Sequence, residues 1–275
     1  MPELPEVETV VRELNQAVKG KKFWKVEMLN KSTFLPSAIV FERELPGRKI
    51  LDISRKGKYI IFNLSGGFKM VVHLRMTGML TVEKVVKNKK YIRGIFTFSS
   101  GQRMFFTDLR KFGKIYLYPE KEYLQKTGMQ KLGLDPVLDL FDSKILEKIY
   151  SGKKGILKAK LLDQTLVAGI GNIYADEICF RIGLNPKSRL EKLKKADFEL
   201  LSEAILYCLK EGIKHNGTTF SDFRGTRGDA GKHQKYLQVY GRTGDACYIC
   251  EGEIKKSRVA GRGTYFCVKC QKIKK

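Results

Sequence analysis

The sequence predicts a multi-domain α+β protein. It has an N-terminal antiparallel β-sandwich that begins with a helix, then a helical domain, and then a C-terminal β-hairpin whose cysteines can bind a zinc ion. Residues 50–118 contain short alternating or β-rich segments separated by glycine-containing turns. Residues 143–214 have helical periodicity, and residues 247–270 contain two C-x-x-C pairs. We therefore expect three parts, at 1–133, 134–236 and 237–275.

The first helix is expected to start near Pro5. Proline fits the first turn of a helix, and the carboxylates of Glu6 and Glu8 favour the positive end of the helix dipole. The helix should continue to Gly20, because one apolar face is kept that far by Val7, Val10, Val11, Leu14 and Val18.

Strands and further helices follow in two blocks. The expected strands are Ile50–Ser54, Tyr59–Leu64, Phe68–Leu74, Ile95–Phe98, Arg103–Thr107 and Lys114–Tyr118. The composition changes around residues 133–141, and the helices expected after it are Ser143–Tyr150, Ile156–Gln164, Ile173–Ile182 and Ala196–Lys214. The glycine- and charge-rich residues 218–235 should form a mobile loop before the hairpin.

Four of the six cysteines have the spacing of a structural zinc site. Cys247 and Cys250 are separated from Cys267 and Cys270 by sixteen residues. Each pair can bind one Zn²⁺ ion from a tight turn, and the residues between the pairs can form a hairpin. Two disulfides or a redox pair are the alternative. The other two cysteines lie in apolar helical segments and are expected to be packing residues.

The charge of the chain points to a polyanionic partner. There are 53 Lys and Arg residues against 29 Asp and Glu, a formal net charge of +24. Such self-repulsion is best explained by binding to nucleic acid. A membrane partner is not expected, because we find no basic amphipathic helix, no lipidation site and no apolar run of roughly 18 residues. The N-terminus also lacks the features of a secretory signal, so we expect a cytoplasmic, nucleoid-associated protein.

The second residue can carry covalent chemistry. Removal of the initiator methionine would leave Pro2 as an N-terminal secondary amine, which can attack an electrophilic carbon and form an iminium. Glu3 stands next to it and can transfer a proton. A proline at this position usually has no such role, so the residues alone leave the question open.

Seven motifs, in one order along the chain, resemble formamidopyrimidine-DNA glycosylases (Fpg) of the bacterial type. They are PELPEVET at 2–9, RKGKY at 55–59, HLRM at 73–76, DLRKFG at 108–113, GIGNIYADE at 169–177, LQVYGR at 237–242 and AGRGT at 260–264. The four spaced cysteines complete the resemblance.

This resemblance implies a bifunctional DNA glycosylase and AP lyase of base excision repair. The enzyme would flip oxidised purines (8-oxoguanine, formamidopyrimidines) out of duplex DNA and excise them through a Schiff base at Pro2, followed by β,δ-elimination. Glu3 would transfer protons and Glu6 would support it, although a favourable charge in the first helical turn explains Glu6 equally well. The helical domain would be a helix-two-turn-helix domain with a base-capping loop at 218–235. One structural Zn²⁺ ion and a monomeric state are expected.

The resemblance also assigns residues that hold the DNA backbone. Lys58 would grip the phosphate beside the lesion, where the residue alone suggests a surface charge. His73 would contact phosphate, where a core histidine is the ordinary interpretation. Asn172 would bind phosphate, where its position at a helix start suggests an N-cap. Further contacts are expected from Tyr240, Lys256 and Arg262; Lys58 and Arg262 are counted with the catalytic residues.

Three residues match the family's wedge, which fills the space that a flipped nucleotide leaves. They are Met76, Arg110 and Phe112: an apolar plug, a planar cation and an aromatic ring. Without the resemblance, Met76 and Phe112 would be expected in the core.

The chain departs from the family pattern at three places. Lys90-Tyr91-Ile92-Arg93 stands where many relatives carry Lys-His-Asp-His, Thr77 lies at a position that varies, and Asn216-Gly217 stands where Gly-Gly is common. These changes should affect lesion preference and loop behaviour more than chemistry.

Two other functions remain open. An endonuclease VIII-type enzyme acting on oxidised pyrimidines would share the scaffold, but that group typically opens with Pro-Glu-Gly-Pro-Glu, whereas this chain has Leu4. A non-enzymatic zinc DNA-binding protein would fit the charge and the cysteines, but it leaves Pro2 and Glu3 without a role.

Overall fold

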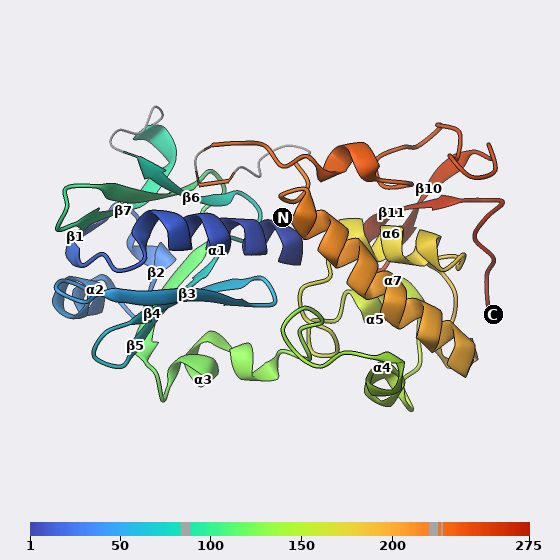
Figure 1. Ribbon diagram of the computed structural model, residues 1–275, viewed down its shortest axis with the longest axis horizontal. Coiled ribbons are helices and arrows are strands. Elements are labelled where there is room, and N and C mark those ends of the chain that lie inside the picture. Colours follow the sequence, from blue (N-terminus) through green and yellow to red (C-terminus); the bar gives the residue numbers. More distant parts are fainter. Residues whose placement is uncertain (84–88, 220–224, 227) are drawn as a thin grey trace. The chain divides into compact units, whose positions relative to one another are not determined.

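The computed structural model describes residues 1–83, 89–219, 225–226 and 228–275. They form two compact units, Met1–Lys131 with His215–Lys232, and Leu132–Lys214 with His233–Lys275 (Figure 1). Residues 215–232 thus belong to the first unit. The division at 133 and 236 stays a prediction. The expected base-capping loop at 218–235 includes residues 220–224 and 227, which lie outside the described residues.

The first unit contains one long helix, α1 (Leu4–Val18), and two sheets. The four-stranded sheet has the order β1-β7-β8-β6, with β1 (Phe23–Met28), β7 (Ile92–Phe98), β8 (Arg103–Asp108) and β6 (Gly78–Glu83). The five-stranded sheet has the order β2-β9-β5-β4-β3, with β2 (Phe34–Leu35), β9 (Lys114–Pro119), β5 (Phe68–His73), β4 (Tyr59–Leu64) and β3 (Ile50–Lys56). All neighbouring strands are antiparallel except β2 and β9. Two short helices complete the unit, α2 (Ala38–Glu44) and α3 (Tyr123–Thr127).

Both sheets and α1 share one hydrophobic core. Alternation along each strand decides which side chains reach it: Ile60, Phe62 and Leu64 of β4 belong to this core, whereas Ile61 points to the opposite face. The apolar face of α1, from Val7 to Val18, packs into the same core. The predicted sandwich with an N-terminal helix is confirmed.

Three strands and two helices of this unit were not predicted: β1, β2, β6, α2 and α3. In β1 a register shift between Phe23 and Lys25 interrupts the pairing with β7, and Trp24 is 65% exposed. Such a bulge breaks the alternation on which the sequence prediction depends.

The second unit is helical and ends in a hairpin. Its helices are α4 (Ser143–Tyr150), α5 (Leu157–Leu161), α6 (Asn172–Arg181) and α7 (Lys195–Lys214). The helix expected at Ile156–Gln164 is shorter than predicted, because Asp163 begins a turn in which its carboxylate accepts the N–H of Thr165.

The hairpin consists of β10 (Ile254–Val259) and β11 (Arg262–Cys267). Its two-residue turn has positive φ at Ala260 (48°) and Gly261 (72°), as a type I′ turn requires. Among the residues that the structure describes, no helix is long and apolar enough to cross a bilayer.

Candidate active site

The N-terminal residues are fixed by the start of α1. Glu3 is the N-cap, and a capping box joins it to Glu6: each side chain accepts the other residue's backbone N–H, that of Glu3 reaching Glu6 Oε2 at 2.8 Å. The second oxygen, Oε1, accepts the N–H of Thr218 at 2.7 Å. Pro2 is buried, and Glu3 and Glu6 are 3% and 1% exposed. The carboxylate of Glu6 therefore supports both the helix start and residue 218.

Lys58 and His73 lie close to one another at one end of the five-stranded sheet. Lys58 occupies the turn between β3 and β4 and is only 6% exposed, so the interpretation as a surface charge is wrong. His73 ends β5, pairs with Tyr59 of β4, and has its ring 4.5 Å from the tyrosine ring.

His73 is neutral in the folded protein. Burial, with the nearby cations Arg75 and Lys58, lowers the pKa of His73 from 6.5 to about 3. Its Nδ1 accepts the N–H of Arg75 at 3.0 Å, so the hydrogen of the neutral ring is on Nε2. The imidazole can therefore donate one hydrogen bond to an anionic oxygen without carrying a charge.

The three residues expected to form the wedge meet on the surface. Met76 is 40% exposed and Phe112 is 50% exposed, so the interpretation of both as core residues is wrong. Arg110 joins them: its Nη1 lies 3.1 Å from the sulfur of Met76, and its guanidinium carbon lies 4.9 Å from the centre of the Phe112 ring. The cation of Arg110 therefore lies between two exposed apolar side chains.

Asp108 organises the loop that carries Arg110 and Phe112, a role that no sequence motif indicated. The residue is 1% exposed. Its Oδ1 accepts the N–H of Arg110 at 3.1 Å and the hydroxyl of Thr77, and its Oδ2 accepts the N–H of Gly113 at 2.7 Å. Its carbonyl accepts from Nε of Arg93 at 2.8 Å. Thr77 and Arg93, two departures from the family pattern, are thus part of this support.

The backbone is strained beside the wedge. Arg75 precedes Met76 and has φ of 55°, and Lys111 lies between Arg110 and Phe112 with φ of 59°. Side chains other than glycine rarely adopt this left-handed conformation, which is concentrated at functional sites.

In the second unit, Asn172 points to the hairpin. The N-cap of α6 is Gly171, so the interpretation of Asn172 as N-cap is wrong. Its Nδ2 donates to the carbonyl of Gly263 at 2.9 Å and to the hydroxyl of Tyr240 at 3.4 Å. Gly263 follows Arg262, the exposed first residue of β11. Asn172 thus fixes the backbone next to Arg262.

Aromatic rings connect the other two expected DNA contacts. The ring of Tyr240 lies 4.8 Å from that of Tyr265, and the ammonium of Lys256 lies 5.5 Å from the Tyr265 ring. Lys256 and Tyr265 are direct partners across the β10–β11 hairpin. The second unit therefore brings Asn172, Tyr240, Lys256 and Arg262 together.

A buried ion pair beneath the hairpin was missed by the sequence analysis. Lys158 of α5 and Asp176 of α6 are both fully buried and 2.7 Å apart. The ammonium also donates to the carbonyl of Gly263 at 3.1 Å and to the hydroxyl of Thr264 at 2.9 Å. Asp176 accepts the N–H of Tyr265 at 3.0 Å. Burial raises the pKa of Asp176 to about 7, against the opposing effect of the ammonium.

Glu177, the next residue of α6, holds the segment before the hairpin. Its carboxylate accepts the N–H groups of Gln238, Val239 and Tyr240 at 2.8, 3.0 and 2.9 Å. Both acids occur in the GIGNIYADE motif, but nothing in the sequence named their partners.

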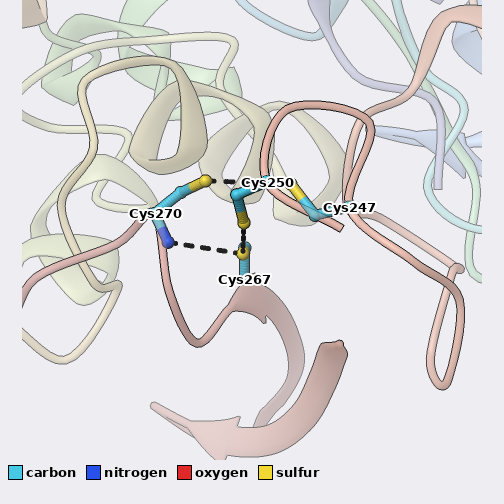
Figure 2. A group of neighbouring side chains, drawn as sticks. All are labelled: Cys247, Cys250, Cys267 and Cys270. Atoms are coloured by element: carbon cyan, nitrogen blue, oxygen red, sulfur yellow. Dashed lines mark hydrogen bonds between the residues drawn. The ribbon is translucent and has the colours of Figure 1, made fainter. Parts of the chain in front are cut away.

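The four spaced cysteines form one cluster that can hold a metal ion (Figure 2). Their sulfur atoms all lie within 4.8 Å of one another, with Cys250 and Cys267 at 3.4 Å and Cys247 and Cys270 at 3.8 Å. Four sulfurs at about 2.3 Å from a tetrahedral ion would be about 3.8 Å apart. No cysteine is in a disulfide among the described residues. The donor set and its spacing fit a metal ion.

Comparison with known proteins defines the class. A family model described as the formamidopyrimidine-DNA glycosylase N-terminal domain matches residues 1–115, and one described as the formamidopyrimidine-DNA glycosylase H2TH domain matches residues 132–224. Together with the capped N-terminal helix and the four-cysteine hairpin, they define a DNA glycosylase. The chain belongs to the formamidopyrimidine-DNA glycosylase family.

Similar proteins cover the whole chain. A formamidopyrimidine-DNA glycosylase of Pelotomaculum thermopropionicum is 41% identical over 100% of both chains. The structure of Lactococcus lactis Fpg with DNA containing an abasic site has a TM-score of 0.90 at 37% identity, over 98% of this chain and 99% of that one. A MutM structure with DNA containing carbocyclic 8-oxo-G also has a TM-score of 0.90 at 37% identity, over 98% of this chain and 100% of that one.

Proposed function

We propose that this protein removes oxidised purines from duplex DNA and then cleaves the strand at the resulting abasic site. The observation that carries the proposal is the N-terminal arrangement: Pro2 is buried beside the capping box of Glu3 and Glu6, in a chain of this family. The structures of similar proteins with 8-oxo-G and abasic DNA support the substrate.

The chemistry starts once Met1 has been removed, because in the chain that begins with Met1 the nitrogen of Pro2 is an amide. The free secondary amine attacks C1′ of the flipped nucleotide, and the glycosidic bond breaks with its electron pair leaving on the purine. Loss of the ring-oxygen bond gives an iminium between Pro2 and C1′. Loss of a C2′ proton then expels the 3′ phosphate, and a second elimination expels the 5′ phosphate.

Glu3 is the proton-transfer group in this proposal, and the other residues hold the substrate. Lys58 and the neutral His73 provide a cation and a hydrogen-bond donor for backbone oxygens. Asn172, Tyr240, Lys256 and Arg262 provide the contacts of the second unit. The wedge of Met76, Arg110 and Phe112 replaces the flipped nucleotide in the stack.

We propose Zn²⁺ as the metal ion of the hairpin. Four thiolates complete its tetrahedral coordination and leave no position for water, so its role is structural. A DNA substrate supports a cytoplasmic, nucleoid-associated location. A monomer is sufficient for the site proposed.

Borohydride trapping tests the proposal. Protein whose N-terminus is shown by intact mass to be Pro2 is incubated with a duplex containing 8-oxoguanine, and with a matched duplex containing thymine glycol. We expect a covalent adduct and faster cleavage of the 8-oxoguanine duplex, and a weaker adduct for Pro2→Gly. No adduct with processed protein would indicate a DNA-binding protein without this activity, and faster cleavage of thymine glycol would indicate an enzyme for pyrimidines.

A further inference from the structure

Arg55 joins α1 to the turn that carries Lys58. Its side chain is 1% exposed, and its Nε donates to Glu8 Oε2 of α1 at 3.0 Å. Its Nη1 donates to the carbonyl of Gly57 at 3.2 Å. This carbonyl belongs to the peptide bond between Gly57 and Lys58. One buried guanidinium is therefore bonded both to the N-terminal helix and to the backbone of the turn.

The turn itself is short. Lys56 and Tyr59 are the last pair of the β3–β4 hairpin. Gly57 and Lys58 are therefore its two turn residues, and Gly57 has φ of 56°. A two-residue turn of this kind takes glycine at its first position. The backbone of Lys58 is thus held by the hairpin, and Arg55 fixes the end of the hairpin to α1.

A second link, further from the turn, sets the direction of β3 along α1. Asn15 Nδ2 donates to the carbonyl of Ile53 at 2.6 Å, and Asn15 Oδ1 accepts the N–H of Ile53 at 3.1 Å. Glu8 precedes Asn15 on the helix, and its partner Arg55 follows Ile53 on the strand. The strand therefore runs toward the N-terminus of α1, which Pro2 precedes.

Stability alone is a weak explanation for the pair of Arg55 and Glu8. Taking a guanidinium and a carboxylate out of water costs free energy comparable with their attraction, so apolar residues of similar volume often stabilise a protein as well. What the pair does provide is direction, because the planar guanidinium holds two acceptors in a fixed geometry. Glu8 is itself held, since its Oε1 accepts from Nε of Arg12 at 2.9 Å. The geometry favours a role in placement.

We propose that Arg55, held by Glu8, is a positioning residue for Lys58. It fixes the backbone that carries the Lys58 ammonium relative to α1, the helix that follows the nucleophile. This inference rests on the proposed function, in which Lys58 binds a phosphate beside the lesion. That phosphate is present whether or not a base is attached, so the loss of Arg55 should slow the cleavage of 8-oxoguanine and abasic duplexes alike. It should do so only while Lys58 is there to be placed.

A double-mutant cycle tests this proposal. Single-turnover cleavage of both duplexes is measured at saturating protein for Arg55→Met, Lys58→Ala and the combination of the two. We expect Arg55→Met to slow both reactions roughly tenfold when Lys58 is present, and by less than about twofold when Lys58 is already alanine. Glu8→Gln keeps an acceptor for Arg55 but loses the charge, so roughly a threefold loss is expected. It replaces Arg55→Met in the cycle if that variant does not fold.

Arg48→Met is the matched control, because Arg48 also joins a helical glutamate to a hairpin turn. Its Nη2 lies 2.8 Å from the carboxylate of Glu44 on α2. Its Nη1 donates to the carbonyl of Ser65, between β4 and β5, at 2.9 Å. That turn carries none of the expected site residues. The loss of Arg48 should therefore lower Tm but leave both rates within about twofold of the unmodified protein.

Equal losses for Arg55→Met with and without Lys58, or an equal loss for Arg48→Met, would show a general structural role and overturn the proposal. A folded Arg55→Met protein with unchanged rates would overturn it too. Binding to a duplex with a stable tetrahydrofuran site repeats the cycle without the chemistry. If the unmodified, processed protein binds this duplex but cleaves neither lesion, the proposed function is wrong, and the binding cycle still decides whether Arg55 places Lys58.

Discussion

Replacing Asp176 by asparagine is expected to lower the free energy of unfolding of the second unit by about 3–5 kcal/mol. Asp176 and Lys158 are both fully buried and lie 2.7 Å apart. The substitution replaces the carboxylate by a neutral amide, while the carbonyl of Gly263 and the hydroxyl of Thr264 remain as neutral acceptors of the ammonium. A buried cation without a counter-charge is expensive, because neutral dipoles replace only part of its lost hydration.

Replacing Lys158 instead of Asp176 should lower the free energy of unfolding by less, above all at low pH. In Lys158→Met the carboxyl of Asp176, whose pKa burial already raises to about 7, loses the cation that opposes this shift and binds a proton. Lys158→Met/Asp176→Leu removes both charges, so we expect its free energy of unfolding to lie within about 2 kcal/mol of the unmodified protein. The effects of the two single substitutions on the free energy of unfolding are therefore strongly non-additive.

These changes in the free energy of unfolding can be measured by urea unfolding, monitored with two probes. Trp24 is the only tryptophan and belongs to the first unit, so its fluorescence is the internal control. Amide hydrogen exchange at residues 263–267 reports on the hairpin that the ion pair supports. A loss below about 1 kcal/mol for Asp176→Asn, or a double variant as unstable as this single variant, would refute the reasoning.

Three further predictions concern other parts of the molecule. Because the pKa of His73 is about 3 when folded and 6.5 in the reference state, its contribution to stability is full above pH 6.5 and lost as the pH falls toward 3. Between pH 7 and 5 the unmodified protein should lose about 2 kcal/mol more than His73→Asn in urea titrations; equal losses would contradict this. Phe112→Ala should leave Tm nearly unchanged, since the ring is half exposed, and slow 8-oxoguanine excision roughly tenfold in single-turnover assays. Chelation should release one metal ion per chain and abolish amide protection in the hairpin, as measured by metal analysis and hydrogen exchange; protection that survives would exclude a structural metal.

The sequence was informative wherever a property is local. The helix at Leu4–Val18 follows from apolar periodicity and a proline in its first turn, and the helix at Lys195–Lys214 from periodicity alone. The two C-x-x-C pairs indicated the cysteine cluster, because each pair is close in space whenever it turns tightly.

What the sequence did not reveal depends on contacts between distant residues. The partners Lys158 and Asp176 are separated by seventeen residues of varied structure, and no periodicity connects them. Asn172 opens a helix, yet its side chain bonds Gly263 of the hairpin instead of capping. The exposure of Met76 and Phe112 likewise depends on the loop that Asp108 holds, which a pattern of apolar residues cannot indicate.

The left-handed residues Arg75 and Lys111 have a consequence for DNA binding. Each costs on the order of 1–3 kcal/mol of conformational energy, which the buried bonds of Asp108 help to offset during folding. Met76 and Phe112 are consequently held in fixed, solvent-exposed positions before any duplex binds. If these side chains form the wedge proposed above, the conformational entropy that a flexible loop would lose on insertion into DNA is already lost during folding, so insertion costs less entropy.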